Sequence, residues 1–178
     1  MNYHLIRTDD MLNGSGLRVV LFVSGCDNHC DGCHNPETWD INGGIHFDNN
    51  VLNQILKELD KDYISGLTIS GGEPLKYENL PDVYNIITMV KTKLPNKNIW
   101  LYTGYNLNIS NFDQTVDVCW DNGLLRNYII GKCDVVCDGR FIKSLVDVNY
   151  PWVGSTNQRV IDVKKTLKAN RIVEYEND

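Results

Sequence analysis

The sequence is organised around residues 19–35, which read VVLFVSGCDNHCDGCHN. The first five of these residues are apolar and rich in branched side chains, which is typical of a strand buried on both faces. Ser24 and Gly25 end that run, and Cys26, Cys30 and Cys33 follow directly. We therefore expect three thiols in a loop at the end of a buried strand.

The C-x3-C-x2-C spacing lets these three thiols converge on one small volume. Converging thiolates select zinc, copper(I) or an iron–sulfur cluster. Structural zinc normally needs a fourth protein ligand, which His29, His34 or a distant cysteine could supply. A four-iron cluster held by three cysteines leaves one iron free to bind another molecule. The spacing favours a cluster over zinc, and both over core thiols without a ligand.

The composition sets the outer limits on the class of protein. The chain has 178 residues, 42% of them hydrophobic, so we expect one domain over residues 1–178. Its formal net charge of -6 argues against binding to duplex nucleic acid, because phosphate contacts need clustered Lys and Arg. No apolar stretch approaches the roughly 18 residues of a membrane span, and the N-terminus lacks a signal pattern. We expect a cytoplasmic protein whose six cysteines are ligands, buried groups or redox thiols rather than disulfides.

Apolar periodicity predicts strands and helices that alternate along the chain. The expected strands cover residues 3–6, 19–23, 66–70, 98–102, 133–137 and 160–163. Helices with one apolar face are expected over residues 51–59 and 83–94, and a weaker helix and turn around Val116, Val118, Leu124 and Leu125. Residues 164–178 are expected to form a surface or frayed tail. The alternation is typical of right-handed parallel β/α folds.

In such folds, ligands bind beyond the carboxyl ends of the strands. Four of the expected strands end in residues suited to chemistry: the three cysteines, Gly71-Gly72-Glu73-Pro74, Thr103-Gly104-Tyr105 and Asp138-Gly139-Arg140. We expect these four endings to form one site. The glycines at 14 and 16 precede a strand instead of following one, so a tight turn is expected there and a dinucleotide motif is not.

The run from Gly14 to Asn35 resembles the signature of radical S-adenosylmethionine (SAM) enzymes that activate glycyl-radical enzymes. Further similarity lies at Trp39 and in residues 70–75, 99–105, 138–141 and 154–159. Within this family, the chain resembles the subfamily that activates the anaerobic ribonucleoside-triphosphate reductase. The alternatives are an activase of another glycyl-radical enzyme, such as pyruvate formate-lyase, and a zinc-stabilised binding module. The resemblance implies an α/β fold in the form of a partial (open) parallel β/α barrel of the radical SAM type.

The resemblance also implies the cofactors and partners. Cys26, Cys30 and Cys33 would hold three irons of a [4Fe-4S] cluster, and SAM would bind the fourth. Reductive cleavage of SAM would then generate a glycyl radical on the reductase, with an electron from an external reductant such as flavodoxin. No residue is expected to be catalytic beyond the cluster and SAM. The SAM contacts implied by the resemblance are Asn35, Gly71, Gly72, Glu73, Thr103, Gly104, Asp138 and Arg140.

Some of these residues have more than one interpretation. Glu73 suits the ammonium group of SAM, or it is a solvated side chain in a turn that ends a strand. Asp138 and Arg140 bind the SAM carboxylate or ribose, or pair with each other. His34 stands where the subfamily usually has Tyr, and we expect it to cap the cysteine loop. Arg140 stands where the subfamily usually has Lys, which puts a direct catalytic role for it in doubt.

The remaining unusual residues are expected to pack in the core. Free cysteine is among the most buried residue types, which favours packing for Cys119, Cys133 and Cys137. The same expectation holds for Trp39, Trp100, Trp120 and Trp152. Residues 154–159 resemble a late family motif to which we assign no function, and they are expected to form a turn before the last strand.

Overall fold

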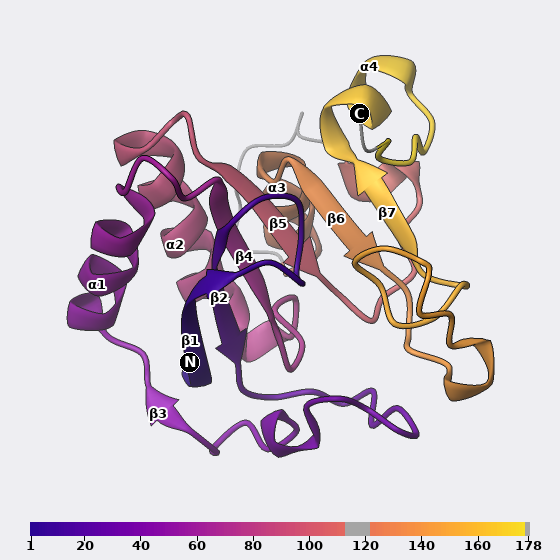
Figure 1. Ribbon diagram of the computed structural model, residues 1–178, viewed down its shortest axis with the longest axis horizontal. Coiled ribbons are helices and arrows are strands. Elements are labelled where there is room, and N and C mark those ends of the chain that lie inside the picture. The colour runs from indigo at the N-terminus through magenta and orange to yellow at the C-terminus, as the bar shows by residue number, and fades with distance from the viewer. Residues whose placement is uncertain (113–121, 177–178) are drawn as a thin grey trace.

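The computed structural model describes residues 1–112 and 122–176, and these residues contain a seven-stranded sheet with the order β3-β1-β2-β4-β5-β6-β7 (Figure 1). The strands are β1 (Asn2–Asp10), β2 (Arg18–Val23), β3 (Ile45–His46), β4 (Gly66–Gly71), β5 (Asn98–Tyr102), β6 (Val135–Asp138) and β7 (Arg159–Asp162). The α-helices are α1 (Asn49–Leu59), α2 (Leu80–Lys93), α3 (Asn122–Lys132) and α4 (Val163–Ala169). Cys119, Trp120, Val116 and Val118, on which expectations were placed, lie outside the described residues.

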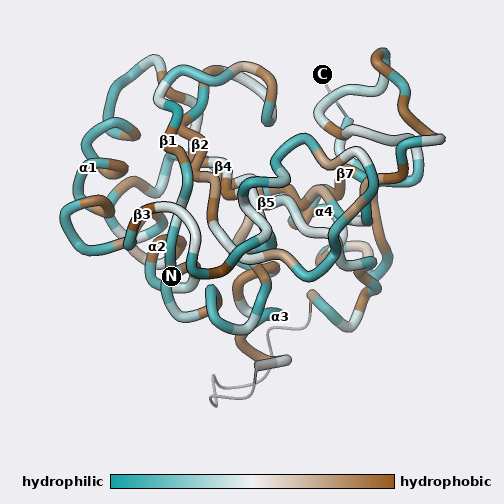
Figure 2. Tube along the Cα trace, turned by 90° about the horizontal axis from the view of Figure 1, so that it is seen from below, coloured by the Kyte–Doolittle hydropathy of each residue, from teal (hydrophilic) through white to brown (hydrophobic). Residues whose placement is uncertain are grey.

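The centre of the sheet consists of four parallel strands, β2, β4, β5 and β6. All six residues of β2 are buried, as are the first five of β4. Strands covered on both faces are apolar along their whole length, since neither face meets water. Figure 2 shows this hydrophobic colouring along β2 and β4. The predicted strands at 19–23, 66–70 and 98–102 are confirmed.

The two longest predicted helices are confirmed as α1 and α2. One face of α1 buries Leu52, Ile55, Leu56 and Leu59. Asp48 begins this helix, because its carboxylate accepts hydrogen bonds from the backbone N–H groups of Asn50 (2.9 Å) and Val51 (3.0 Å). In Figure 1, α1 and α2 lie to the left of the sheet and α4 lies above β7.

The expectation of a partial (open) parallel β/α barrel of the radical SAM type is wrong. The sheet is mixed and open, because β1 pairs antiparallel with β2, β3 antiparallel with β1, and β7 antiparallel with β6. Within the described ranges the sheet ends at β3 on one side and β7 on the other, and it does not close. The fold is a mixed α/β sheet with a parallel centre.

The shortness of one connection and the lack of an α-helix in another explain this difference. Parallel strands need a crossover of a dozen or more residues, usually a helix. Only residues 11–17 join β1 to β2, so the chain turns back antiparallel. Residues 139–158 join β6 to β7 with one short 3-10 turn at Lys143–Leu145 and no α-helix to cover the sheet. The chain therefore returns beside β6 in the opposite direction.

The segment after α4 runs back along β7. The backbone N–H of Asp162 donates to the carbonyl of Val173 (2.9 Å), and that of Tyr175 donates to the carbonyl of Val160 (2.7 Å). A bridge between Ile161 and Glu174 lies between these bonds. The ring of Tyr175 packs edge-on against Trp100, with ring centroids 5.2 Å apart.

Two expectations about burial are also confirmed. Cys133 and Cys137 are 4% and 1% exposed and belong to the core. Trp100 is 1% exposed, as expected, whereas Trp152 and Trp39 are only half-buried; Trp152 packs against Trp100 with ring centroids 5.2 Å apart. None of the helices within the described ranges has the length and apolar character needed to cross a bilayer.

Candidate functional site

The carboxyl ends of β2, β4, β5 and β6 surround one pocket of about 200 Å³. Nine of the eleven predicted site residues line it: Cys26, Cys30, Cys33, Asn35, Gly71, Gly72, Thr103, Gly104 and Arg140. Glu73 and Asp138 are not among the lining residues. The pocket is also lined by Asn13, Asn28, Tyr102 and Trp152, which sequence reasoning did not assign to the site. The structure thus brings together most of the residues that follow the four strands.

The cysteine loop presents three free, partly exposed thiols to this pocket. Its tight turns place His29 at φ 43° and Gly32 at φ 72°, in the left-handed region. The backbone N–H of Cys33 donates to the carbonyl of Cys30 (3.1 Å). The backbone N–H of Asn35 donates to the Cys33 sulfur (3.4 Å). Such N–H donors stabilise a thiolate that binds a metal.

Cys26 is the first of the three cysteines after β2. Burial raises the pKa of the Cys26 thiol, and hydrogen bonds from Asn28 and His29 offset part of this rise. The donors would stabilise the charged sulfur once a metal replaces its proton. Three thiols, two of them with backbone donors directed at the sulfur, fit the ligand set of an iron–sulfur cluster that leaves one iron without a cysteine.

The two histidines of the loop lie against aromatic rings. His29 packs on Trp39 with ring centroids 4.7 Å apart, and His34 packs on Phe141 at 5.1 Å. Over residues 1–112 and 122–176, no three His, Cys, Asp or Glu side chains form a group that could hold a single metal ion. His34 connects the cysteine loop to the segment that follows β6.

Glu73 is only 2% exposed and lies next to residues that line the pocket. Its carboxylate accepts hydrogen bonds from the Thr103 hydroxyl (2.8 Å) and from the backbone N–H groups of Gly104 (2.7 Å) and Leu75 (3.0 Å). The amide of Asn28 lies 3.4 Å from the same carboxylate. Burial raises the pKa of Glu73, and the bonds from Gly104 and Thr103 oppose this rise. The carboxylate therefore joins the loops that follow β2, β4 and β5.

Gly71 pairs with Val23 at the end of the β2–β4 ladder, and Gly72 follows it. A Cβ on Gly72 would lie 2.6 Å from the carbonyl oxygen of Gly25. Gly71 has φ 101°, and a Cβ on it would lie 2.6 Å from the backbone nitrogen of Val23. Both positions therefore need glycine for the packing of this chain, whatever ligand occupies the pocket.

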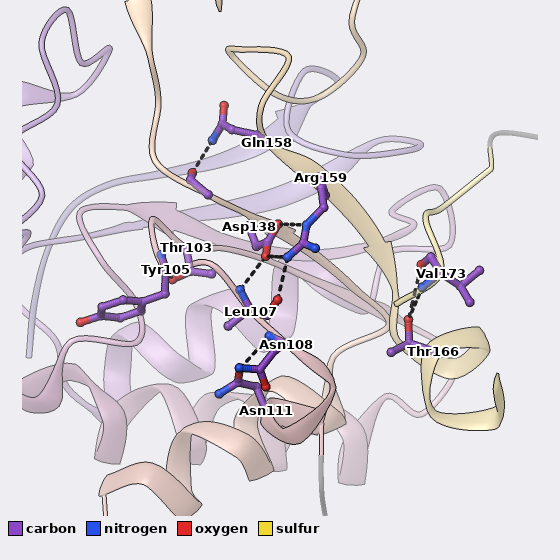
Figure 3. Close-up of polar contacts among 11 residues, drawn as sticks. Thr103, Tyr105, Leu107, Asn108, Asn111, Asp138, Gln158, Arg159, Thr166 and Val173 are labelled. Carbon is purple, nitrogen blue, oxygen red and sulfur yellow. Dashed lines mark hydrogen bonds and ion pairs between the residues drawn. The ribbon is translucent and has the colours of Figure 1, made fainter. Parts of the chain in front are cut away.

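Asp138 pairs with Arg159 (Figure 3), and the guanidinium of Arg140 bonds Asn28 instead. Asp138 is 1% exposed, and its carboxylate accepts from Nε of Arg159 (3.0 Å) and from the backbone N–H of Leu107 (2.8 Å). Arg140 is exposed, and its guanidinium donates to the backbone carbonyl of Asn28 in the cysteine loop. Asp138 is thus buried and bonded to Arg159 and Leu107, while Arg140 is exposed and lines the pocket.

Three thiols in the loop that follows β2 are the ligand set of an iron–sulfur protein, and residues 12–161 match the family model described as a 4Fe-4S single cluster domain. The anaerobic ribonucleoside-triphosphate reductase-activating protein of Escherichia coli (strain K12) is 36% identical over 90% of this chain and 97% of that protein. Proteins of the same name are 38% identical in Enterobacteria phage T4, over 90% of this chain and 93% of the phage protein, and 39% identical in Vibrio cholerae, over 89% and 96%. The chain therefore belongs to the family of anaerobic ribonucleoside-triphosphate reductase-activating proteins, which confirms the predicted resemblance.

Proposed function

We propose that this chain generates a glycyl radical on an anaerobic ribonucleoside-triphosphate reductase, with a [4Fe-4S] cluster and SAM as cofactors. The observation that carries this proposal is the convergence of three free thiols and three further strand endings on one pocket. When bound, the cluster and SAM supply a one-electron cleavage of the carbon–sulfur bond of the sulfonium.

Cys26, Cys30 and Cys33 would hold the cluster. The N–H groups of Asn28, His29 and Asn35 directed at two of the sulfurs support thiolate ligation. Because three cysteines would ligate three irons, the fourth iron would have no cysteine ligand and could bind the amino and carboxylate groups of SAM.

The lining residues would bind SAM directly. The proposed contacts are Asn35, Gly71, Gly72, Thr103, Gly104 and Arg140. Glu73 and Asp138 belong to the same proposal in a supporting role, since their carboxylates are occupied by donors from this chain. They hold the loops on which Thr103, Gly104 and Arg140 lie.

Aromatic side chains form the wall of the pocket beside β5 and β6. Tyr102, Phe141 and Trp152 line it, and the Tyr102 hydroxyl donates to the backbone carbonyl of Trp152 (2.8 Å). An apolar wall excludes water from a reactive site, which suppresses side reactions. The same proposal places a single-domain protein in the cytoplasm, with the reductase and an external one-electron reductant such as flavodoxin as its partners.

The test is anaerobic reconstitution with iron and sulfide, followed by mixing with reductase, SAM and a one-electron reductant. We expect a brown protein, 5′-deoxyadenosine as a product, and a carbon-centred doublet on the reductase by electron paramagnetic resonance. Omission of SAM is the control and should remove the doublet. A colourless protein with one zinc per chain would support the zinc-stabilised binding module instead. A doublet on pyruvate formate-lyase but not on the reductase would identify a different glycyl-radical partner.

A further inference from the structure

Residues 154–159, which the sequence left without a function, are joined to the segment that follows β6. The side-chain amide of Gln158 donates to the backbone carbonyl of Gly139 (2.8 Å; Figure 3). The side-chain amide of Asn157 donates to the backbone carbonyl of Arg140 (2.8 Å). Gly139, Arg140 and the adjacent Phe141 all line the pocket.

The side-chain oxygen of Gln158 also holds the backbone within residues 154–158. This oxygen, Oε1, accepts from the backbone N–H groups of Gly154 (3.0 Å) and Ser155 (3.1 Å). The Ser155 hydroxyl in turn accepts from the backbone N–H of Ile142 (3.1 Å). Both polar atoms of the Gln158 amide are therefore engaged with the protein backbone, although the residue lies at the pocket.

Arg159 extends the same connections to the loop after β5. Its guanidinium pairs with Asp138 and donates to the backbone carbonyl of Leu107 (2.7 Å), while the N–H of Leu107 donates to Asp138 (Figure 3). Arg140 reaches in the opposite direction, to the carbonyl of Asn28 in the cysteine loop. Hydrogen bonds thus link residues 157–159 and the residues that follow β6 to the loop after β5 and to the cysteine loop after β2.

The segment between β6 and β7 needs this support, because residues 139–158 contain only one short 3-10 turn. Backbone without a helix or sheet ladder is positioned by side-chain hydrogen bonds or remains mobile. The two carbonyls that Gln158 and Asn157 engage belong to the part of this segment that lines the pocket.

We propose that Gln158 and Asn157 are positioning residues that hold the Gly139 and Arg140 carbonyls and thereby place the Arg140 and Phe141 side chains at the pocket. This role goes beyond the proposed function and depends on it only in that SAM serves as the probe ligand. Neither residue needs to touch the reacting atoms.

The test compares Gln158→Met with the wild-type chain, both full-length and loaded with the cluster. Methionine keeps the length of the side chain and removes both of its polar atoms. We expect amide hydrogen exchange at Gly154 and Ser155 to become about tenfold faster, since both N–H groups lose their acceptor. Exchange at Ile142, whose N–H bonds the Ser155 hydroxyl, should also become faster because the segment that follows β6 is held less firmly. We expect the Kd for SAM to rise about tenfold. Iron content and the resonance spectrum of the reduced cluster without SAM should not change.

Two further variants make the test specific. Asn157→Ala removes only the contact with Arg140, so we expect a smaller rise in the Kd for SAM, about threefold. The matched control is Thr166→Val, which removes a bond from the Val173 N–H (2.9 Å) in the same C-terminal region, away from the pocket (Figure 3). It should leave the Kd for SAM unchanged.

The positioning role would be overturned if Gln158→Met bound SAM with wild-type affinity, or if Thr166→Val weakened SAM binding equally. Unchanged exchange at Ile142 in Gln158→Met would also overturn it, and this measurement needs no SAM. If the wild-type chain itself bound no SAM, the proposed function would fail, while the exchange at Ile142 would still decide whether Gln158 positions the segment.

Discussion

The hydroxyl of Thr103 donates a hydrogen bond of 2.8 Å to the carboxylate of Glu73, thirty residues earlier in the chain. Glu73 follows β4 and Thr103 follows β5, so this bond joins the ends of two neighbouring parallel strands. The backbone N–H of Gly104 donates to the other oxygen of the same carboxylate at 2.7 Å. The buried carboxylate of Glu73 therefore accepts hydrogen bonds from two residues that line the pocket, and these bonds hold the ends of β4 and β5 together.

Thr103→Val should destabilise the fold by about 1–3 kcal/mol, because it leaves a buried carboxylate with one donor fewer at nearly constant side-chain volume. The measurement is urea unfolding of the cluster-loaded protein. Thr92→Val is the control, since its hydroxyl bonds the Thr88 carbonyl at an exposed position of α2. We expect that control to change the free energy of unfolding by no more than about 0.5 kcal/mol. Equal losses in the free energy of unfolding for Thr103→Val and Thr92→Val would show that the bond to Glu73 stabilises the fold no more than an exposed hydroxyl bond does.

Cys30→Ala should remove the cluster, because the remaining two thiols cannot hold four irons in the pocket. We expect iron to fall from about four per chain to near zero after anaerobic reconstitution, and the visible absorption to disappear. Cys133→Ala is the matched control, since Cys133 is buried in the core away from the pocket, and it should keep its iron. Full SAM cleavage by Cys30→Ala would contradict the ligand assignment.

Gly72→Val should weaken SAM binding and also destabilise the ends of β2 and β4. The new Cβ would lie 2.6 Å from the Gly25 carbonyl oxygen and 3.0 Å from that of Thr38, and both are backbone atoms that cannot move aside cheaply. We expect a loss of about 1–3 kcal/mol in the free energy of unfolding from this overpacking. Isothermal titration with SAM and urea unfolding provide the two measurements. A variant with normal SAM affinity would argue against this side of the pocket as the SAM site.

Cys137 should resist alkylation in the folded chain. Burial raises its pKa to about 12 from the ordinary 9.0, and the hydrogen bond with Tyr102 opposes this rise only in part. Below the pKa, the thiolate fraction falls tenfold for each pH unit, so at pH 8 it is about a thousandfold smaller than that of an ordinary thiol. Mass spectrometry after iodoacetamide treatment should find Cys137 labelled only once urea has unfolded the chain. Rapid labelling at neutral pH without urea would contradict this burial.

The centre of the fold and the composition of the pocket could be predicted from the sequence because their signals are local. A strand buried on both faces is apolar throughout, as residues 19–23 show, and an amphipathic helix repeats its apolar face, as residues 51–59 show. Parallel strands then place their carboxyl ends together. This is why the residues that follow four separate strands lie around one pocket.

The direction of the outer strands and the roles of several polar residues could not be predicted in this way. Pairing direction at β1 and β7 depends on the connections, and residues 2–10 and 159–162 carry no signal for it. Arg18 is fully buried in β2, and its partners Thr68 and Asn98 lie fifty and eighty residues away. Gln158 likewise bonds a carbonyl nineteen residues earlier. Such contacts depend on the folded arrangement.

Residues 173–175 affect the tendency of this protein to self-associate. An open sheet ends in a strand with unpaired N–H and C=O groups, and such an edge can recruit a strand from another molecule. Here the carbonyl of Val160 and the N–H of Asp162 are taken by residues 173–175 of the same chain. Shortening the chain before residue 173 would uncover that edge and favour self-association into aggregates.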